Sequence, residues 1–225
     1  MKPLQIENDK INFLCIENKQ AFYGFISDLY DLSTGKQNDI ILSDNDSPVK
    51  FSNYADLLMN FIPFELNNKK LLTKLYDKLS KEAVDANMLS ETHSFEIVFQ
   101  SYVLKLCEQF DFELEFDNDF DVKGLLKAIN LRFLDEYSTL SEKIFEYMIN
   151  MRELCGIKVF IFVGVCSLIS DEEFNLFIDT VINHRIPLLI IENIDCLYGT
   201  KINKRVIDED FCEIWLNFFL IYIIM

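Results

Sequence analysis

The residues best suited to chemistry in this chain are the acids of one short segment, in which carboxylates alternate mostly with Phe and Leu. In an extended backbone, side chains two residues apart point to the same side, so these carboxylates would share one face. Clustered carboxylate oxygens suit Ca²⁺, which takes six to eight oxygen ligands in flexible geometry. The acids of this stretch, hereafter the acidic segment, are Asp111, Glu113, Glu115, Asp117, Asp119 and Asp121.

Two interpretations of the acidic segment stay open. It is not an EF-hand, because with Asp117 as first ligand the sixth position is Val122 instead of Gly and the twelfth is Ala128 instead of Glu. One interpretation is a solvated acidic loop ahead of a helix. The other is a calcium site whose candidate ligands are Glu113, Glu115, Asp117, Asp119 and Asp121.

One concentrated basic feature stands against the acids. On a helix, Lys70, Lys74, Lys78 and Lys81 fall within one narrow stripe, while the leucines of the same stretch fall on another face. Such a stripe can follow a phosphate backbone by releasing counterions, without reading bases. It can equally be an ordinary solvated helix face. The candidate nucleic-acid contacts are Lys69, Lys70, Lys74, Lys78 and Lys81, with a weaker pair at Lys123 and Lys127.

Signatures of catalysis are missing from the sequence. A strand followed by a helix near the start of the chain fits phosphate-binding NTPase folds, but residues 17–24 read ENKQAFYG and lack G-x-x-x-x-G-K-[ST]. The only histidines are His93 and His184, and no motif pairs them with a nucleophile or with cysteines at zinc-site spacing. We therefore expect no enzymatic activity and no catalytic residue.

Composition limits the class of protein further. A net charge of −16 excludes a uniformly basic nucleic-acid binder, so any contact with DNA must come from a local cluster. The six cysteines are scattered, which predicts reduced thiols buried in the core. The N-terminus carries no apolar signal, and the apolar run at 215–225 is far short of the about 20 residues of a membrane helix. We expect a cytoplasmic protein with no membrane contact.

The clearest folding unit is a strand, a helix and a second strand in the C-terminal third. The apolar runs at 158–164 and 186–192 predict strands buried on both faces, as parallel sheets require. Between them, apolar residues at helical spacing follow Ser170, a typical N-cap, and Glu173 can return the bond in a capping box. The unit predicts an α/β fold.

Patterns elsewhere extend this fold. We expect a strand at 11–16, a helix at 19–32 ended by Gly35, a short strand at 39–43 and a helix at 48–64. From about residue 65 to 150 the periodicity is helical. The sequence thus predicts an α/β head from residues 1–60 and 151–225, with a mostly parallel sheet in the layout of P-loop NTPases but without the phosphate loop. An inserted α-helical leg covers residues 61–150.

The order of these features resembles one family. The helical middle is followed by the acidic segment, by GLLKAI at 124–129, and by KVFIFVG at 158–164. Then come SDEEF at 170–174, PLLIIE at 187–192 and DEDF at 208–211. Over residues 55–213 the chain resembles the type II-A CRISPR-associated protein required for spacer acquisition.

The resemblance implies a non-enzymatic homotetrameric ring that threads double-stranded DNA through a basic hole and binds DNA ends. It implies calcium in the helical leg, with Glu113, Glu115, Asp117 and Asp119 matching the family ligands, and association with the CRISPR integrase and the type II effector nuclease. Two alternatives remain: a nucleotide-responsive regulator that does not hydrolyse nucleotide, and a scaffold that only holds the integration machinery together.

Overall fold

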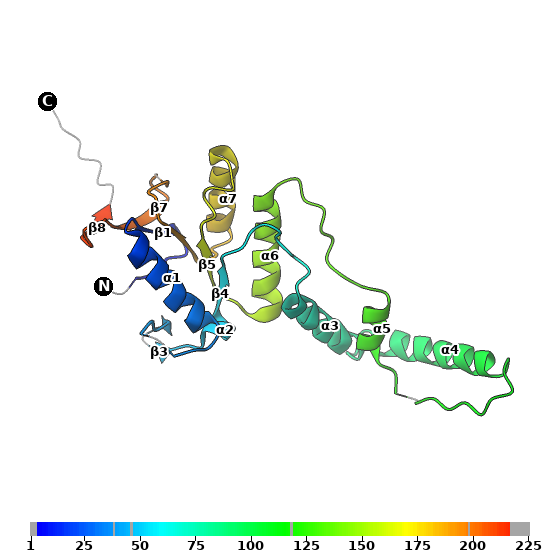
Figure 1. Ribbon diagram of the computed structural model, residues 1–225. Helices are drawn as coiled ribbons and strands as arrows, with labels where there is room; N and C mark the ends of the chain where they lie inside the picture. Colours follow the sequence, from blue (N-terminus) through cyan, green and yellow to red (C-terminus); the bar gives the residue numbers. More distant parts are fainter. Residues whose placement is uncertain (1–3, 38, 46, 118, 198, 217–225) are drawn as a thin grey trace. The chain divides into compact units, whose positions relative to one another are not determined.

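The computed structural model describes residues 4–37, 39–45, 47–117, 119–197 and 199–216. Contacts divide the chain into two compact units (Figure 1). The sheet unit comprises residues 1–66 and 136–225, and the helical unit comprises residues 67–135. Residues 217–225, most of the apolar C-terminal run, lie outside the described residues.

The sheet unit is organised around six strands. Their order is β4 (Ala55–Leu58), β5 (Val159–Val163), β6 (Leu188–Glu192), β1 (Ile11–Ile16), β7 (Ile202–Ile207) and β8 (Glu213–Leu216). Neighbours from β4 to β7 pair in parallel, and β8 pairs antiparallel to β7. A separate hairpin joins β2 (Ser43–Asp44) to β3 (Ser47–Pro48). The mixed α/β fold with a mostly parallel sheet is as the sequence predicts.

Helices cover both faces of the sheet. On one face lies α1 (Lys19–Ser33), whose Ile26 and Leu29 pack with Leu14, Ile191 and the short α2 (Phe51–Tyr54). The other side carries α6 (Leu140–Cys155) and α7 (Asp171–Asn183), visible beyond the strands in Figure 1. There the Phe162 and Phe177 rings stack with centroids 6.4 Å apart. Covering both faces is what an all-apolar parallel strand requires.

The unit β5–α7–β6 confirms the predicted strand–helix–strand motif. Ser170 caps α7, because its side chain accepts a hydrogen bond from the Glu173 N–H. Glu173, however, does not close the predicted capping box. Its Oε1 accepts from the backbone N–H of Ser141, 3.1 Å away in the first turn of α6, where the positive end of a helix favours a carboxylate. One acid thus ties the starts of two helices together.

The tie through Glu173 generates a stability prediction. Its pKa is lowered, first by hydrogen bonds from Ser141, so its stabilisation is present above the ordinary Glu pKa and is lost as the pH falls through the lowered value. We expect Glu173→Ala to reduce the free energy of unfolding at neutral pH by about 1 kcal/mol, the typical worth of a cap. Denaturant unfolding measured from pH 7 to pH 3 should show the difference shrinking in acid.

Glu172→Ala provides the control, since Glu172 lies in the same turn of α7 and its side chain is exposed. The Glu172→Ala variant should lose only a few tenths of a kcal/mol in free energy of unfolding, from the interaction of this carboxylate with the helix dipole. Equal losses in the two variants, or a Glu173→Ala loss independent of pH, would contradict the tie.

Three helices build the helical unit: α3 (Lys69–Ala83), α4 (Leu89–Cys107) and α5 (Val122–Ala128). Asn68 caps α3 by accepting from the Leu71 N–H. The apolar side of α3 is buried, and the Tyr76 hydroxyl donates to the Leu131 carbonyl at 2.7 Å. These bonds fix which face of α3 meets solvent.

The structure differs from the sequence predictions at three elements. Residues 48–64 do not form one helix: only α2 is helical, and the next four residues enter the sheet as β4. The predicted strand at 39–43 reduces to the two residues of β2. Although its periodicity resembles that of the leg, α6 belongs to the sheet unit, because Ile144, Met148 and Met151 are buried there. The helical unit therefore ends at residue 135, not at 150.

None of the helices in the described part of the chain combines the length and the apolar composition that crossing a membrane requires.

Candidate functional site

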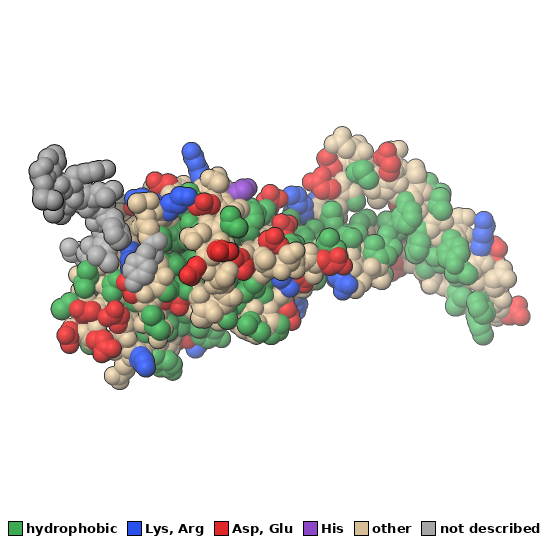
Figure 2. Space-filling view, turned by 90° about the horizontal axis from the view of Figure 1, so that it is seen from above, with side chains coloured by type: hydrophobic (Ala, Val, Ile, Leu, Met, Phe, Trp, Pro, Cys, Tyr) green, Lys and Arg blue, Asp and Glu red, His purple; other side chains and the backbone are tan. Residues whose placement is uncertain are grey.

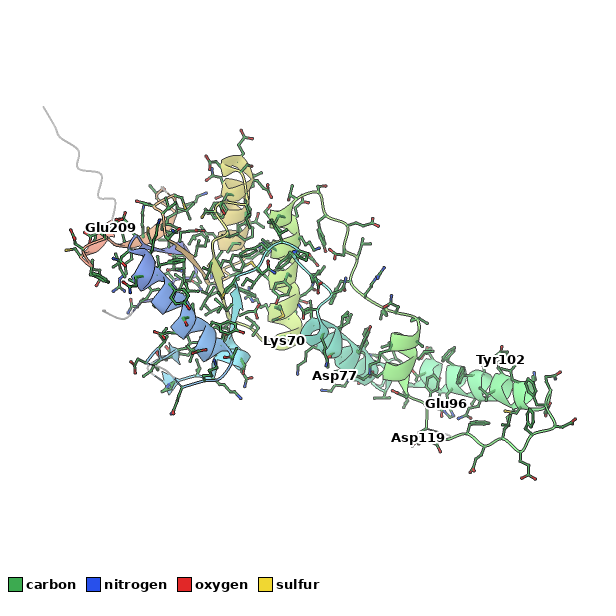
Figure 3. The ribbon with its side chains drawn as sticks, viewed as in Figure 1. Lys70, Asp77, Glu96, Tyr102, Asp119 and Glu209 are labelled. Carbon is green, nitrogen blue, oxygen red and sulfur yellow. The ribbon has the colours of Figure 1, made fainter. Side chains whose placement is uncertain are left out.

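The lysine stripe lies on the solvent side of α3. Lys70, Lys74, Lys78 and Lys81 are all exposed, whereas Leu71 and Tyr76 face the interior of the helical unit. At 1.5 Å per residue, the stripe from Lys70 to Lys81 runs for about 16 Å. Lys69 is exposed as well but lies about 100° around the helix from Lys70. We call the four aligned residues the lysine face (Figure 3 labels Lys70).

The second pair of predicted lysines joins this face through an acid. α5 packs against α3, and the Lys123 ammonium forms an ion pair with Asp77, which projects from α3 among the lysines. The pKa of Asp77 is lowered, first by the hydrogen bond from Lys123 and further by Lys74 and Lys81. Lys127, one turn further along α5, is exposed. The structure therefore brings Lys123 next to the lysine face, and Asp77 balances the positive charge of Lys123.

Between α4 and α5, the described residues of the acidic segment form neither helix nor strand. All five candidate ligands, Glu113, Glu115, Asp117, Asp119 and Asp121, are exposed. Within the described residues, no three of these carboxylates converge to the spacing of a metal site. Alternation along the sequence therefore does not by itself assemble a site. The donor chemistry fits calcium, but an ion would have to draw the segment together.

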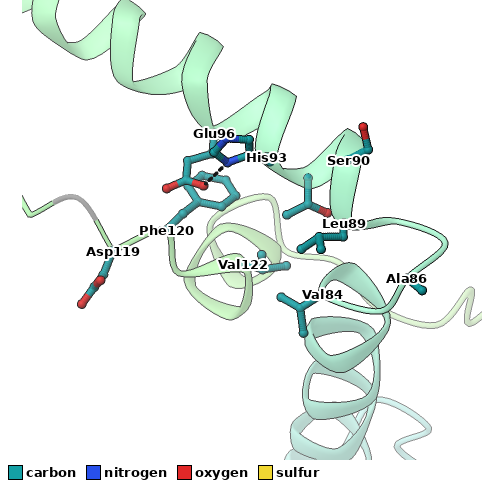
Figure 4. Close-up of a pocket in the computed structure, with 10 residues that line it drawn as sticks. Val84, Ala86, Leu89, Ser90, His93, Glu96, Asp119, Phe120 and Val122 are labelled. Atoms are coloured by element: carbon teal, nitrogen blue, oxygen red, sulfur yellow. Dashed lines mark hydrogen bonds and ion pairs between the residues drawn. The ribbon is translucent and has the colours of Figure 1, made fainter.

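One aromatic side chain fixes the end of the acidic segment. The Phe120 ring packs against Phe95 and Phe99 of α4, with centroid distances of 5.6 and 5.9 Å. It lines a cavity of about 680 Å³ between the ends of α3, α4 and α5 (Figure 4). His93, Glu96 and Asp119 also line this cavity, and in Figure 4 the Asp119 carboxylate points away from the other two side chains. The candidate ligands Asp119 and Asp121 thus flank an anchored residue.

We expect Phe120→Ala to release this anchor. Loss of a half-buried ring should lower the free energy of unfolding by about 1–2 kcal/mol, below the 3–5 kcal/mol of a fully buried Phe. Urea unfolding measures the loss, and cleavage by a Glu-specific protease at Glu115 should become faster.

The control is Phe112→Ala in the same segment, since Phe112 is 71% exposed and its ring stacks on that of Phe110, another exposed residue. It should change the free energy of unfolding by less than about 0.5 kcal/mol. If both variants behave alike, Phe120 does not anchor the segment.

The cysteines depart from the sequence prediction. All six are free, but only Cys15 is buried; Cys196 and Cys212 are exposed and the others are half-buried. Cys166 and Cys196 meet Glu192 at the carboxyl ends of β5 and β6. No spacing in the sequence signals this group, because Cys166 and Cys196 lie 30 positions apart and the parallel register of β5 and β6 brings them together.

Charge states in this group are strongly perturbed. A hydrogen bond joins the Cys166 and Cys196 side chains. This bond, and after it burial, raises the pKa of the Cys166 thiol, while the same bond lowers the pKa of Cys196. Burial raises the pKa of Glu192. Burial also raises the pKa of Cys15, the neighbour of Glu192 across the sheet, to about 12, so Cys15 remains a thiol at neutral pH.

The start of α1 leaves no place for a phosphate. Only Glu17 and Asn18 connect β1 to α1, whereas the phosphate loop needs eight residues between strand and helix body. The Asn18 side chain already accepts from the N–H groups of Gln20 and Ala21, at 3.1 and 3.0 Å. The amides that would cradle phosphate oxygens in an NTPase are therefore occupied by the protein itself.

Fold and surface together define a class: an α/β protein with a mostly parallel sheet and a separate helical unit that carries a lysine face. Comparison with known proteins makes this specific. The family model for CRISPR-associated protein (Cas_Csn2) matches residues 30–211, more than half of the chain. The chain therefore belongs to the type II-A Csn2 family, and this membership indicates a role in CRISPR adaptation.

Individual relatives agree with this assignment. CRISPR-associated protein Csn2 of Enterococcus faecalis is 22% identical over 225 residues, which cover 98% of this chain and 94% of the relative. Among solved structures, Stu0660 of Streptococcus thermophilus superimposes with a TM-score of 0.53 at 16% identity. That match covers 85% of this chain and 65% of Stu0660, and it supports the fold.

Proposed function

We propose that this chain binds double-stranded DNA without sequence preference, as a homotetrameric ring that acts on DNA ends during spacer acquisition in the cytoplasm. The observation that carries the proposal is the lysine face, an exposed and aligned set of cations in a chain of net charge −16. Aligned cations recognise the phosphate backbone, which has the same charge at every sequence. Membership of the Csn2 family supports the adaptation role.

A ring accounts for two further properties. It lets a basic inner surface coexist with an acidic exterior, as the overall charge requires. It also gives the apolar side chains of α4 a partner: that helix has no buried residue in the chain alone, and Figure 2 shows hydrophobic side chains gathered in this part of the molecule. The exposed apolar residues of α4 are Leu89, Phe95, Ile97, Val98, Phe99, Tyr102, Leu104 and Leu106.

In this proposal the protein is not an enzyme. Its sheet unit derives from the P-loop NTPase fold but serves as a structural head, consistent with the two-residue connection after β1. The occupied amides at the start of α1 argue against a nucleotide-responsive regulator. The expected protein partners are the CRISPR integrase and the type II effector nuclease.

Charge reversal of the lysine face tests DNA binding. The variant Lys70→Glu, Lys74→Glu and Lys78→Glu should bind linear double-stranded DNA at least 100-fold more weakly in a gel-shift series at several salt concentrations. Each lost phosphate contact should also reduce the slope of log affinity against log salt by about 0.9. Closed circular DNA of the same length should bind more weakly than linear DNA, because a ring loads at ends.

A matched control reverses three exposed lysines of the sheet unit, Lys10, Lys19 and Lys50, with the same change in net charge. It should keep most of its affinity. Equal losses of DNA affinity in both triple variants would mean that net charge alone, and not the lysine face, causes the effect. If the lysine-face variant binds DNA normally, the face has no role; if it loses DNA but keeps adaptation and its protein partners, the scaffold alternative is correct.

We further propose that Ca²⁺ organises the acidic segment through Glu113, Glu115, Asp117, Asp119 and Asp121. Their exposure leaves carboxylate oxygens accessible to a hard cation, which would offset the repulsion between like charges. The ion would convert an extended connection into an ordered one and reduce the negative charge of the unit that carries the lysine face.

Calorimetric titration with Ca²⁺ tests this site, with melting temperature and oligomer size measured with and without chelator. The pair Glu115→Gln and Asp119→Asn should abolish the heat of binding and the stabilisation by Ca²⁺. The pair Glu7→Gln and Asp9→Asn, exposed acids of the sheet unit, should leave both unchanged. A chelator that alters neither melting temperature nor oligomer size would make the segment an ordinary solvated loop.

A further inference from the structure

Three metal-binding side chains converge at the carboxyl ends of β5 and β6. Cys166 follows β5 by three residues, Glu192 is the last residue of β6, and Cys196 lies four residues beyond it. Their ligand atoms, two sulfurs and a carboxylate oxygen, all lie within 4.8 Å of one another. Within the described residues, this group is the one that meets the spacing of a metal site.

The Glu192 side chain is held in place by the backbone of Cys166. The backbone N–H of Cys166 donates to the Glu192 Oε1 at 2.8 Å. Glu192 itself is 7% exposed and stands beside Cys15 of β1 in the parallel register. A rigid strand therefore presents its carboxylate toward the loop that carries Cys166.

Cys196 is held from both sides by one buried lysine. Lys204 of β7, whose side chain is 3% exposed, forms an ion pair with Asp195 and donates to the Leu197 carbonyl at 3.0 Å. The residues before and after Cys196 are thereby fixed to a neighbouring part of the sheet. The Glu192 side chain and the residues on either side of Cys196 are thus positioned by interactions that do not involve an ion, as a preformed metal site requires.

The donor set identifies the class of ion. Thiolate ligands favour soft or borderline cations, and two thiolates with one carboxylate suit Zn²⁺ in tetrahedral geometry. At Zn–S distances of about 2.3 Å, two sulfurs on one tetrahedral ion stand about 3.8 Å apart, within the spread of the group. Three protein ligands leave the fourth position to solvent, and the exposure of Cys196 provides access.

We propose that Cys166, Glu192 and Cys196 form a zinc site that ties the loop after β5 to the loop after β6. The ion binds to the two thiolates, whose protons pass to solvent, and to the Glu192 carboxylate. The site is independent of the proposed DNA and calcium functions, since all of its residues lie in the sheet unit.

Metal titration of the full chain tests the proposal. The protein, stripped of metal under reducing conditions, should bind one equivalent of Zn²⁺ in competition with a chromophoric chelator and gain melting temperature. Co²⁺ in place of Zn²⁺ should give thiolate-to-metal charge-transfer absorption. Cys166→Ser and Cys196→Ser should each bind at least tenfold more weakly and lose the charge-transfer band, and Glu192→Gln should weaken binding while preserving the hydrogen bond to Cys166.

Two controls separate this site from other metal binding. Cys212→Ser removes an exposed thiol outside the group and should leave Zn²⁺ affinity unchanged. The acidic-segment pair Glu115→Gln and Asp119→Asn should also retain full Zn²⁺ affinity, so that failure of the calcium proposal and failure of the zinc site remain distinguishable. The proposal is overturned if reduced wild-type protein binds no Zn²⁺, if the cysteine variants bind as tightly as wild type, or if a Cys166–Cys196 disulfide persists in excess thiol and excludes the metal.

Discussion

Complete burial of β1 is the constraint on which the rest of the sheet unit depends. All six of its residues are buried, and it pairs in parallel with β6 on one side and β7 on the other. Parallel neighbours cannot be joined by tight turns, so the chain must cross over the sheet, and these crossovers supply the helices that cover its faces. Because β7 lies against this buried strand, its charged residues are buried too and need partners. Lys204 pairs with Asp195, and Arg205, which is 1% exposed, pairs with Glu213 of β8.

These buried ion pairs determine how the edge of the sheet is built. A buried charge without a partner costs several kcal/mol, so the loop after β6 must place Asp195 near Lys204, and β8 must fold back to bring Glu213 to Arg205. The conformation of both segments follows from these charges as much as from apolar burial. One consequence is local order at Cys196, which lies between two residues that Lys204 holds.

Sequence patterns predicted the elements whose burial is uniform, and they failed where partners lie far away in the chain. β5, α7 and β6 were predictable because their apolar runs and the Ser170 cap carry the information locally. β7 was missed, since INKRVI looks too polar for a central strand until Asp195 and Glu213 are in place. The helical spacing of Tyr54, Leu57, Leu58 and Phe61 predicts a helix where β4 lies, whereas pairing with β5 decides the conformation of these four strand residues. The helical face of α3 was predictable; the link from Lys123 to Asp77 was not, because it joins two helices.

The two kinds of candidate site differ in what creates them. The acidic segment is conspicuous in the sequence, yet its carboxylates repel one another, and among the residues that the structure describes no three of them converge. The group of Cys166, Glu192 and Cys196 has no signature in the sequence, yet parallel pairing, a backbone hydrogen bond and a buried lysine bring its atoms together without an ion. A site assembled by the fold loses less conformational entropy on binding than one that the ion itself must order. Metal binding at the sheet should therefore stabilise one existing conformation, whereas binding at the acidic segment must create one.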